Sequence, residues 1–307
     1  MEKQICVFLL FLFFFPKAYG ELCSPMFKAK KIATFDKKLN NEISGISYSN
    51  TYTNRIYIHN DSGSDASFFV TDTRVRVNNK VKIYGYYAVD FEDMDVGPCG
   101  KDDCLFIGDI GDNGHRRDFL NIIVIKEQYK FPKILRPFKN IKVRYDDGKS
   151  HNAESLSIHP GTGDLYILTK SGSELPKLFT LPHSTWIKAD TKKIYPLTLV
   201  GDIDLSKIFR NAPKKITSMD ISPDGKKFIV LNYNNAFEFN LDLASVNSLS
   251  THYLLENTIH KKVDLKRLIQ QEAITYTPSG DLLYTTERVG FLAKPHLYKV
   301  FCHPEEG

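Results

Sequence analysis

Glutamates recur along the chain at the start of similar β-rich segments, and a loop rich in aspartate and glycine lies between two of them. The glutamates are Glu42, Glu92, Glu154 and Glu272. The loop, GDIGDNGHRR at residues 108–117, carries Asp109, Asp112 and Asn113. Its glycines suggest a nucleotide-binding loop, but a strand-like run at residues 122–125 follows where that fingerprint requires a helix. The two carboxylates would also repel phosphate, so we exclude a dinucleotide site.

Brought together, these carboxylates would need a positive partner, because like charges in a partly dry site raise one another's pKa. Ca²⁺ accepts about six to eight carboxylate, amide and carbonyl oxygens in flexible geometry. No cluster of cysteines and histidines has the spacing of a zinc site. The residue types therefore predict bound calcium. The alternative for the loop is that its aspartates and Asn113 only cap the backbone through local hydrogen bonds.

Five copies of one β-rich unit would position these acids. Three segments align without gaps from Glu154, Thr217 and Glu272, and each has a proline six residues after its first residue, followed by a glycine-containing turn. The segment from Glu92 keeps the same spacing to its proline, and the segment from Glu42 follows the pattern without a proline. Successive starts lie 50, 62, 63 and 55 residues apart. That period matches one four-stranded blade of a β-propeller.

The end of the chain lacks one strand, and the beginning offers one. The last unit stops at Phe301 before a fourth strand, whereas residues 28–35, KAKKIATF, form an unassigned strand-like run. This run can complete the last blade. We therefore expect an all-β fold, a five-bladed β-propeller closed by an N-terminal strand, with six blades as the alternative.

In a propeller the first strands line a central channel, and the loops between second and third strands lie at the same mouth. The units should therefore bring both acidic and basic side chains to that mouth. The acidic ones are Glu42, Asp61, Glu92, Asp109, Asp112, Glu154 and Glu272. The basic ones are Arg116, Arg117, Lys170 and Arg288.

The first twenty residues predict a secretory signal peptide, with Lys3, an apolar run at residues 7–15 and the small-residue ending Ala18-Tyr19-Gly20. We expect cleavage near Gly20, a secreted or periplasmic location, and one propeller domain over residues 21–307. The apolar run is shorter than the roughly 20 residues of a membrane-spanning helix. Cleavage lowers the formal charge from +5 to +4, which is too mild to indicate nucleic-acid binding.

Four cysteines remain after cleavage, and an even number in an oxidising compartment suggests disulfides. Cys99 and Cys104 flank a tight turn and are expected to pair. Cys23 and Cys302 lie at opposite ends of the mature chain. A bond between them would tie the closing strand to the last blade.

Several motifs together resemble a group of exported bacterial propeller proteins related to the phytase-like and esterase-like propellers. They include DFEDMDVGP, GDIGDNGHRR, HNAESLSIHPGTGDLYILTK and QQEAITYTPSGD, and the resemblance covers nearly the whole mature chain. It implies calcium ions held by the seven acidic residues named above, with Arg116, Arg117, Lys170 and Arg288 facing the substrate. The phytases of this group are longer and six-bladed, and Thr217 interrupts the acidic ring here.

Three functions fit this sequence. The first is a calcium-dependent hydrolase of a phosphoester or similar ester, and the second is a non-catalytic extracellular module that binds a ligand or a protein. A glycoside hydrolase ranks behind both. Sugar sites use exposed tryptophan and tyrosine side chains as platforms, and the only tryptophan, Trp186, lies in a loop well after the third strand of its unit. We expect a monomer whose partner is a small anionic molecule or another extracellular ligand.

Overall fold

The computed structural model describes residues 21–24, 28–35, 43–61, 65–172, 174–209, 215–246, 255, 258–266, 270–286 and 294–302. The predicted signal peptide, Glu42 and Arg288 lie outside these residues. Strands dominate the described chain, which confirms the expected all-β class. The helices are short: α1 (His183–Trp186), α2 (Leu205–Ile208) and a 3₁₀ helix at Leu243–Ser245. Neither α-helix approaches the length of a membrane span, and no other helix of the described residues does.

The first sheet is an antiparallel run of four strands with a short fifth strand at its outer edge. Its strands, in spatial order, are β2 (Ile43–Tyr48), β3 (Arg55–Asn60), β4 (Ser67–Asp72), β5 (Val77–Ile83) and β9 (Ile134–Leu135). Strand β9 pairs with β5 in parallel.

An eight-stranded sheet follows and consists of two antiparallel four-strand runs. The first run is β6 (Phe91–Cys99), β7 (Asp102–Asp109), β8 (Leu120–Lys126) and β10 (Lys139–Tyr145). The second is β11 (Ala153–Ile158), β12 (Leu165–Thr169), β13 (Lys177–Leu181) and β14 (Ile194–Asp202). The outer strands β10 and β14 pair in parallel and join the two runs.

Two further four-stranded antiparallel sheets complete the structure. One is β15 (Ile216–Ile221), β16 (Phe228–Asn232), β17 (Ala236–Phe239) and β18 (His260–Val263). The other is β19 (Gln271–Tyr276), β20 (Leu282–Thr286), β21 (His296–Val300) and the N-terminal β1 (Lys30–Thr34).

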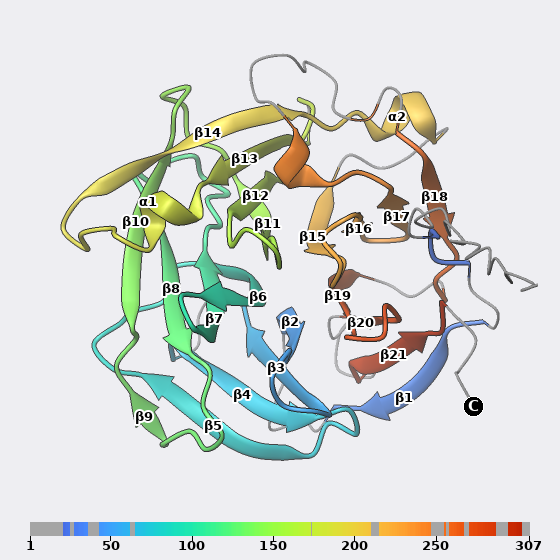
Figure 1. The fold of residues 1–307 in the computed structure, drawn as a ribbon, viewed down its shortest axis with the longest axis horizontal. Coiled ribbons are helices and arrows are strands. Elements are labelled where there is room, and N and C mark those ends of the chain that lie inside the picture. Colours follow the sequence, from blue (N-terminus) through green and yellow to red (C-terminus); the bar gives the residue numbers. More distant parts are fainter. Residues whose placement is uncertain are drawn as a thin grey trace, which may run out of the picture.

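The first strands of these five runs lie at the centre of the molecule (Figure 1). Strands β2, β6, β11, β15 and β19 each contact the next, and β19 contacts β2, so they form a closed ring. Below, this is called the first-strand ring. These strands are buried along nearly their whole length, whereas most residues of the outer strand β5 are exposed. That difference follows from position, because an inner strand has protein on both faces and an outer strand faces water.

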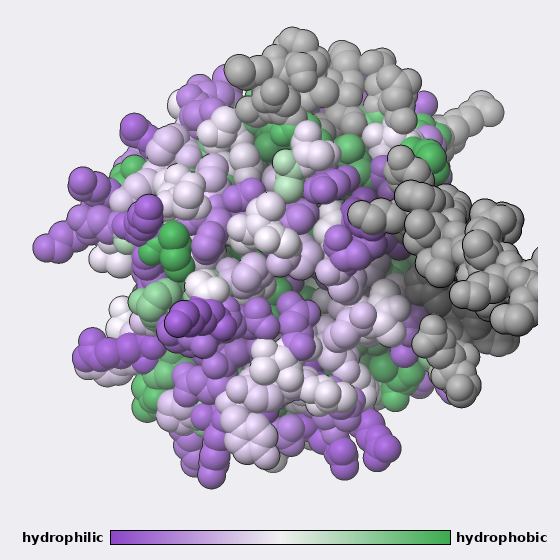
Figure 2. Space-filling model, viewed as in Figure 1, coloured by the Kyte–Doolittle hydropathy of each residue, from purple (hydrophilic) through white to green (hydrophobic). Residues whose placement is uncertain are grey.

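Apolar side chains fill the space between neighbouring runs. One core cluster joins Phe106 and Ile122 of the β6–β10 run to Ile167 and Phe179 of the β11–β14 run, with Trp186 of α1 packed on Phe106 at a ring separation of 5.1 Å. On the face seen in Figure 2, hydrophilic side chains predominate and hydrophobic ones form small separate patches. The large apolar side chains therefore serve mainly to hold one run against the next.

The N-terminal strand closes the structure as expected from the sequence. Strand β1 pairs antiparallel with β21, where Lys31 lies opposite Tyr298. Cys23 is bonded to Cys302, with a Cα–Cα distance of 4.6 Å, and Cys99 is bonded to Cys104 across the β6–β7 turn. Both are the pairs inferred from the sequence.

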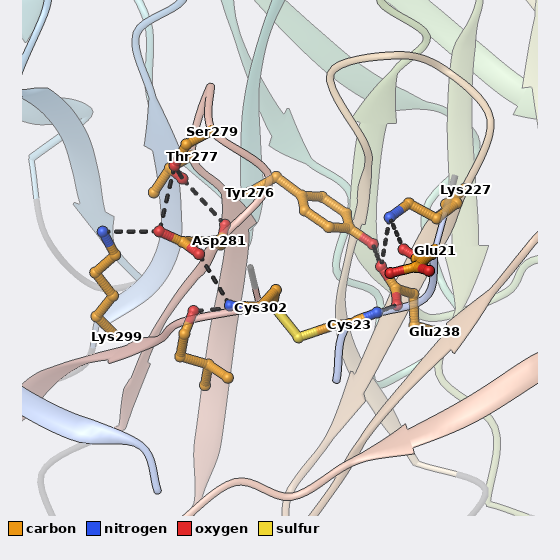
Figure 3. Close-up of a disulfide and its surroundings, with 11 residues drawn as sticks. Glu21, Cys23, Lys227, Glu238, Tyr276, Thr277, Ser279, Asp281, Lys299 and Cys302 are labelled. Atoms are coloured by element: carbon orange, nitrogen blue, oxygen red, sulfur yellow. Dashed lines mark hydrogen bonds and ion pairs between the residues drawn. A yellow bond between two sulfur atoms is a disulfide. The ribbon is translucent and has the colours of Figure 1, made fainter. Parts of the chain in front are cut away.

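A buried ion pair supports this junction (Figure 3). The Glu238 carboxylate, which is fully buried, accepts hydrogen bonds from the Cys23 N–H and, at 2.7 Å, from the Tyr276 hydroxyl. Lys227 lies 3.5 Å from the same carboxylate and donates to the carbonyl of Glu21 at 2.8 Å. The segment before β1 is thus anchored to two neighbouring sheets.

Candidate metal centre

All five first strands carry a β-bulge at the same place, one or two residues from their start. The strand pairing shifts at this point in each case, and the bulged residues are Ser44, Glu92, Glu154, Thr217 and Glu272. A bulge turns side chains away from the regular alternation of a strand and is common next to functional sites. We call these five residues the bulge ring.

The bulge ring corrects the sequence alignment of the first unit. Glu42 was aligned with Glu92, but the residue of β2 in the equivalent pairing position is Ser44, two residues later. The first unit lacks the proline that fixed the alignment of the others. The ring therefore contains three glutamates, and Glu42 itself lies outside the described residues.

Three carboxylates converge beside this ring. Oxygens of Asp61, Asp90 and Glu92 all lie within 4.8 Å of one another. Asp61 follows β3, Asp90 directly precedes β6, and Glu92 is the bulged residue of β6. Asp61 and Glu92 are among the ligands expected from the sequence, whereas Asp90 lies outside the repeated pattern.

The backbone beneath these carboxylates is shaped to receive them. A Cβ atom at Gly111 would collide with both Glu92 Oε1 and Asp90 Oδ2. Glycine at this position therefore lets the two side chains approach each other. An all-oxygen donor set of three carboxylates fits Ca²⁺, which prefers oxygen ligands and tolerates irregular geometry.

The electrostatics of the cluster favour a cation. Burial raises the pKa of Glu92 well above its usual range, and the charges of Glu154, Asp61 and Asp90 raise it further. The ammonium group of Lys170 only partly opposes this effect. A bound cation would oppose these repulsions and favour the charged form of the carboxylates.

Lys170 is engaged by the neighbouring glutamate. Its ammonium group forms an ion pair with Glu154 and lies 5.2 Å from the centre of the Tyr233 ring. Burial lowers the pKa of Lys170, but the Glu154 carboxylate more than offsets this, and the net pKa is raised. Burial likewise raises the pKa of Glu154, against the opposing effect of Lys170. Lys170 therefore balances the charge of Glu154 at the rim of the cluster.

Asp109 fixes the backbone next to the carboxylate cluster through hydrogen bonds. Its carboxylate is fully buried and accepts hydrogen bonds from the Tyr86 hydroxyl at 2.5 Å, Val89 N–H at 3.1 Å, Asp90 N–H at 2.9 Å and the Arg117 guanidinium at 2.8 Å. Arg117 also donates to the carbonyl of Gly111 at 2.8 Å. Asp109 and Arg117 thus fix the segments that carry Asp90 and Gly111, and their side chains are occupied by that task.

Asp112 caps the loop it belongs to. It accepts hydrogen bonds from the backbone of Arg116 at 2.9 Å and of Arg117 at 3.0 Å, and from the Ser150 hydroxyl. These bonds outweigh burial and lower its pKa. The local-cap alternative considered for this loop therefore describes Asp112, while Arg116 points its exposed side chain to solvent.

The remaining ring positions lie farther along the first-strand ring. Glu272 is nearly buried in the bulge of β19, and the Thr217 hydroxyl donates to the carbonyl of Gln271 at 2.9 Å. Neither belongs to the group formed by Asp61, Asp90 and Glu92.

A polar cleft of about 270 Å³ opens beside Lys170. Its lining includes His115, Lys149, Ser150, His151, Asn152 and Lys170. Asn152 links the cleft to the bulge ring, because its amide donates to Glu154 at 3.4 Å and to Asn113 at 3.2 Å. A ligand in this cleft would lie next to the bulge ring.

Three buried aspartates that are not among the expected site residues lie below the ring. Asp93, Asp95 and Asp220 accept hydrogen bonds from the backbone N–H groups of Leu156, Ile158 and Tyr276, respectively, at 3.1, 2.7 and 2.6 Å. Each donor belongs to the first strand of the next run, whose inner edge has no further strand to pair with. These aspartates therefore join neighbouring runs. In the sequence they are marked only by their spacing from the bulged residue: Asp93 and Asp95 follow Glu92 by one and three residues, and Asp220 follows Thr217 by three.

Comparisons with known proteins add no family assignment. No protein-family model and no curated protein sequence matches this chain. Among solved structures, the hydrazine synthase of Kuenenia stuttgartiensis is similar with a TM-score of 0.40 and 16% identity, covering 87% of this chain and 60% of that one. A structure of U3-55K is similar with a TM-score of 0.41 and 9% identity, covering 84% and 67%. This chain thus spans 60% of the length of the hydrazine synthase chain.

Proposed function

We propose that this chain is a secreted five-bladed β-propeller that binds Ca²⁺ at its channel mouth and presents a ligand-binding face there. Support for the fold comes from the five antiparallel four-strand runs, the closed first-strand ring and the closing strand β1. An experimental structure that shows six runs around the axis would contradict the blade number.

The convergence of Asp61, Asp90 and Glu92 carries the calcium assignment. These residues would hold the ion, and Gly111 would leave room for their side chains. When bound, the ion would neutralise the carboxylates and offer a positive site to an anionic oxygen. Asp109 and Arg117 would keep Asp90 and Gly111 in position rather than bind the ion themselves.

Isothermal titration calorimetry with CaCl₂ tests this assignment. We expect binding to the wild type and at least a tenfold loss of affinity in Asp90→Asn. The matched control is Asp118→Asn, an exposed carboxylate on the adjacent loop and outside the cluster. Absence of calcium binding to the wild type, or equal weakening in both variants, would reject the site.

Binding is the better supported use of this face, because two of the four cations expected to hold a substrate are already paired with carboxylates. Arg117 is bonded to Asp109 and Lys170 to Glu154. The cleft still offers Lys149 and His115 to a small anionic ligand. We infer that such a ligand would lie between the metal centre and this cleft.

A calcium-dependent hydrolase is the second candidate, favoured by the proximity of Lys170 and the cleft to the acidic cluster. Turnover of a generic phosphoester in the presence of Ca²⁺ would support it, with Lys170→Ala and Arg288→Ala lowering kcat/KM by an order of magnitude or more. Lack of turnover across phosphoesters, carboxylic esters and glycosides, with a ligand still bound, would leave the binding function.

A further inference from the structure

A second cavity lies at the opposite end of the first strands from the metal centre. It has a volume of about 550 Å³ and is bordered by Tyr48 and Ser49 at the end of β2 and by Thr277 after β19. The bulge ring lies at the start of the same strands. Five residues of strand separate Ser44 from Ser49, or about 16 Å at ~3.3 Å per residue. The cavity is therefore separate from the proposed calcium site.

The cavity spans the junction where the chain closes. Ile32 of β1 and Lys299 of β21 line it from one side, and the β2–β3 turn and the β4–β5 turn line it from the other. Its walls thus come from the first and last runs and from the N-terminal strand. It exists in this form only when β1 is paired with β21.

Hydroxyl and amide groups dominate its polar lining. They come from Ser49, Asn50, Thr53, Asn54, Thr73 and Ser279. Such groups both donate and accept hydrogen bonds, as the hydroxyls of a saccharide do. Ile32, Pro278 and Leu283 add apolar surface, against which the C–H face of a sugar ring can pack.

The charge of the cavity argues against a polyanionic ligand. Lys299 is neutralised by Asp281 at 2.9 Å and also lies over the Phe301 ring. Arg74 is exposed at the rim. A largely uncharged ligand matches this lining better than a phosphate-rich one, since a polyanion would need several uncompensated cations.

The rim of the cavity is held rigidly. The Thr73 hydroxyl donates to Asn54 Oδ1 at 2.5 Å, and the backbone of Asn54 donates to the Tyr48 hydroxyl at 2.9 Å. The Asp72 carboxylate fixes the adjoining turn through the backbone N–H groups of Arg74 and Arg76, both at 3.0 Å. Val75 in this turn has a φ of 58°, which is unusual for a β-branched residue and requires such support. A preformed rim lowers the cost of ordering on binding.

We propose that this cavity binds a saccharide of one or two rings. The volume lies within the usual range of small-ligand pockets. Hydroxyl and amide groups lie beside a larger apolar wall in this cavity, and this combination matches the O–H groups and the C–H face of a pyranose. This site does not depend on calcium or on the function proposed for the opposite face.

Saturation-transfer difference NMR tests this site with glucose, galactose, mannose, N-acetylglucosamine, maltose and cellobiose as probes. At least one sugar should show binding to the wild type, in the presence of EDTA as well as of Ca²⁺. Thr53→Trp and Ser279→Trp, at two exposed rim positions, should each weaken that binding at least tenfold. The matched control, Thr191→Trp, lies in an exposed turn outside the cavity and should bind as the wild type does.

Three results would overturn the proposal: no binding of any of these sugars, undiminished binding in both rim variants, or equal loss in Thr191→Trp. Sugar binding that disappears with EDTA would also overturn it, because the sugar would then lie at the metal centre. The proposal for the metal centre fails by a different result, the absence of calcium binding.

Discussion

The carboxylate of Asp93 in β6 accepts a hydrogen bond of 3.1 Å from the hydroxyl of Ser218 in β15, although 125 residues separate them in sequence. These strands are not neighbours in the first-strand ring, because β11 lies between them. The same Asp93 oxygen accepts the N–H of Leu156 in β11. One buried carboxylate thus connects three of the five runs, directly below the bulged Glu92.

Gly111→Ala should disable calcium binding with little effect on the fold. The added Cβ would collide with carboxylate oxygens of Glu92 and Asp90, so we expect at least a tenfold loss of calcium affinity by calorimetry. Gly114→Ala in the same loop is the matched control, since its Cβ would have no contact closer than 3.5 Å. Equal affinity in the two variants would contradict the role assigned to Gly111.

Asp95→Asn should flatten the pH dependence of stability. Burial raises the pKa of Asp95 from 3.8 to about 6, against the opposing hydrogen bonds of Ile158 and Ser157. The folded state therefore holds this proton more tightly than the unfolded state, and the resulting stabilisation is complete below about pH 4 and lost as the pH rises through 6. The effect is at most of the order of 3 kcal/mol.

Urea unfolding between pH 4 and 7.5 measures how steeply the free energy of unfolding changes with pH. Other buried carboxylates titrate as well, so the informative quantity is the difference in slope between wild type and Asp95→Asn. Asp102→Asn, at an exposed carboxylate of β7, serves as control and should keep the wild-type slope. A slope that is unchanged in Asp95→Asn would contradict the prediction.

The two disulfides should contribute unequally to stability. Cys23–Cys302 closes a sequence separation of 279 residues and Cys99–Cys104 one of 5. Loop-closure entropy predicts about 5.6 kcal/mol for the first and about 2 kcal/mol for the second. Denaturation of Cys23→Ser/Cys302→Ser and Cys99→Ser/Cys104→Ser compares them. A peptide map of the unreduced wild type that joins Cys23 to Cys99 or Cys104 would refute the pairing itself.

If the proposed signal peptide is cleaved, the mature protein should begin at or near Glu21. Cleavage after Gly20 is expected from the sequence, and the carbonyl of Glu21 is already held by the buried Lys227. Intact mass and N-terminal sequencing of the protein secreted by cells that express residues 1–307 determine its first residue. A mature form that retains the apolar run at residues 7–15 would contradict both the cleavage and the proposed secretion.

The strands and the closure were accessible from the sequence because they depend on local patterns. Prolines and glycine-containing turns marked four repeats, and the missing last strand together with the spare run at residues 28–35 indicated β1. The unit without a proline was aligned two residues out of place, so Glu42 was given the position of Ser44. A bulge changes register in three dimensions and leaves no composition signal of its own.

The metal centre was only partly accessible for a different reason. Asp61 and Glu92 were expected at the site, but Asp90 precedes its strand and lies outside the repeated pattern. Asp109 and Asp112 belong to the expected loop, yet both are saturated by hydrogen-bond donors of the protein. A carboxylate that binds a cation and one that caps a backbone have the same sequence signature, and only the positions of nearby N–H groups separate them.

The pairing of β1 with β21 also sets an order of events during synthesis. Lys30–Thr34 is made among the first strands, but its partner His296–Val300 is made last. Until β21 is made, β1 has an unpaired edge. A pairing between residues so distant in sequence also slows folding. We expect this protein to depend on chaperones that shield β1 until β21 has been synthesised.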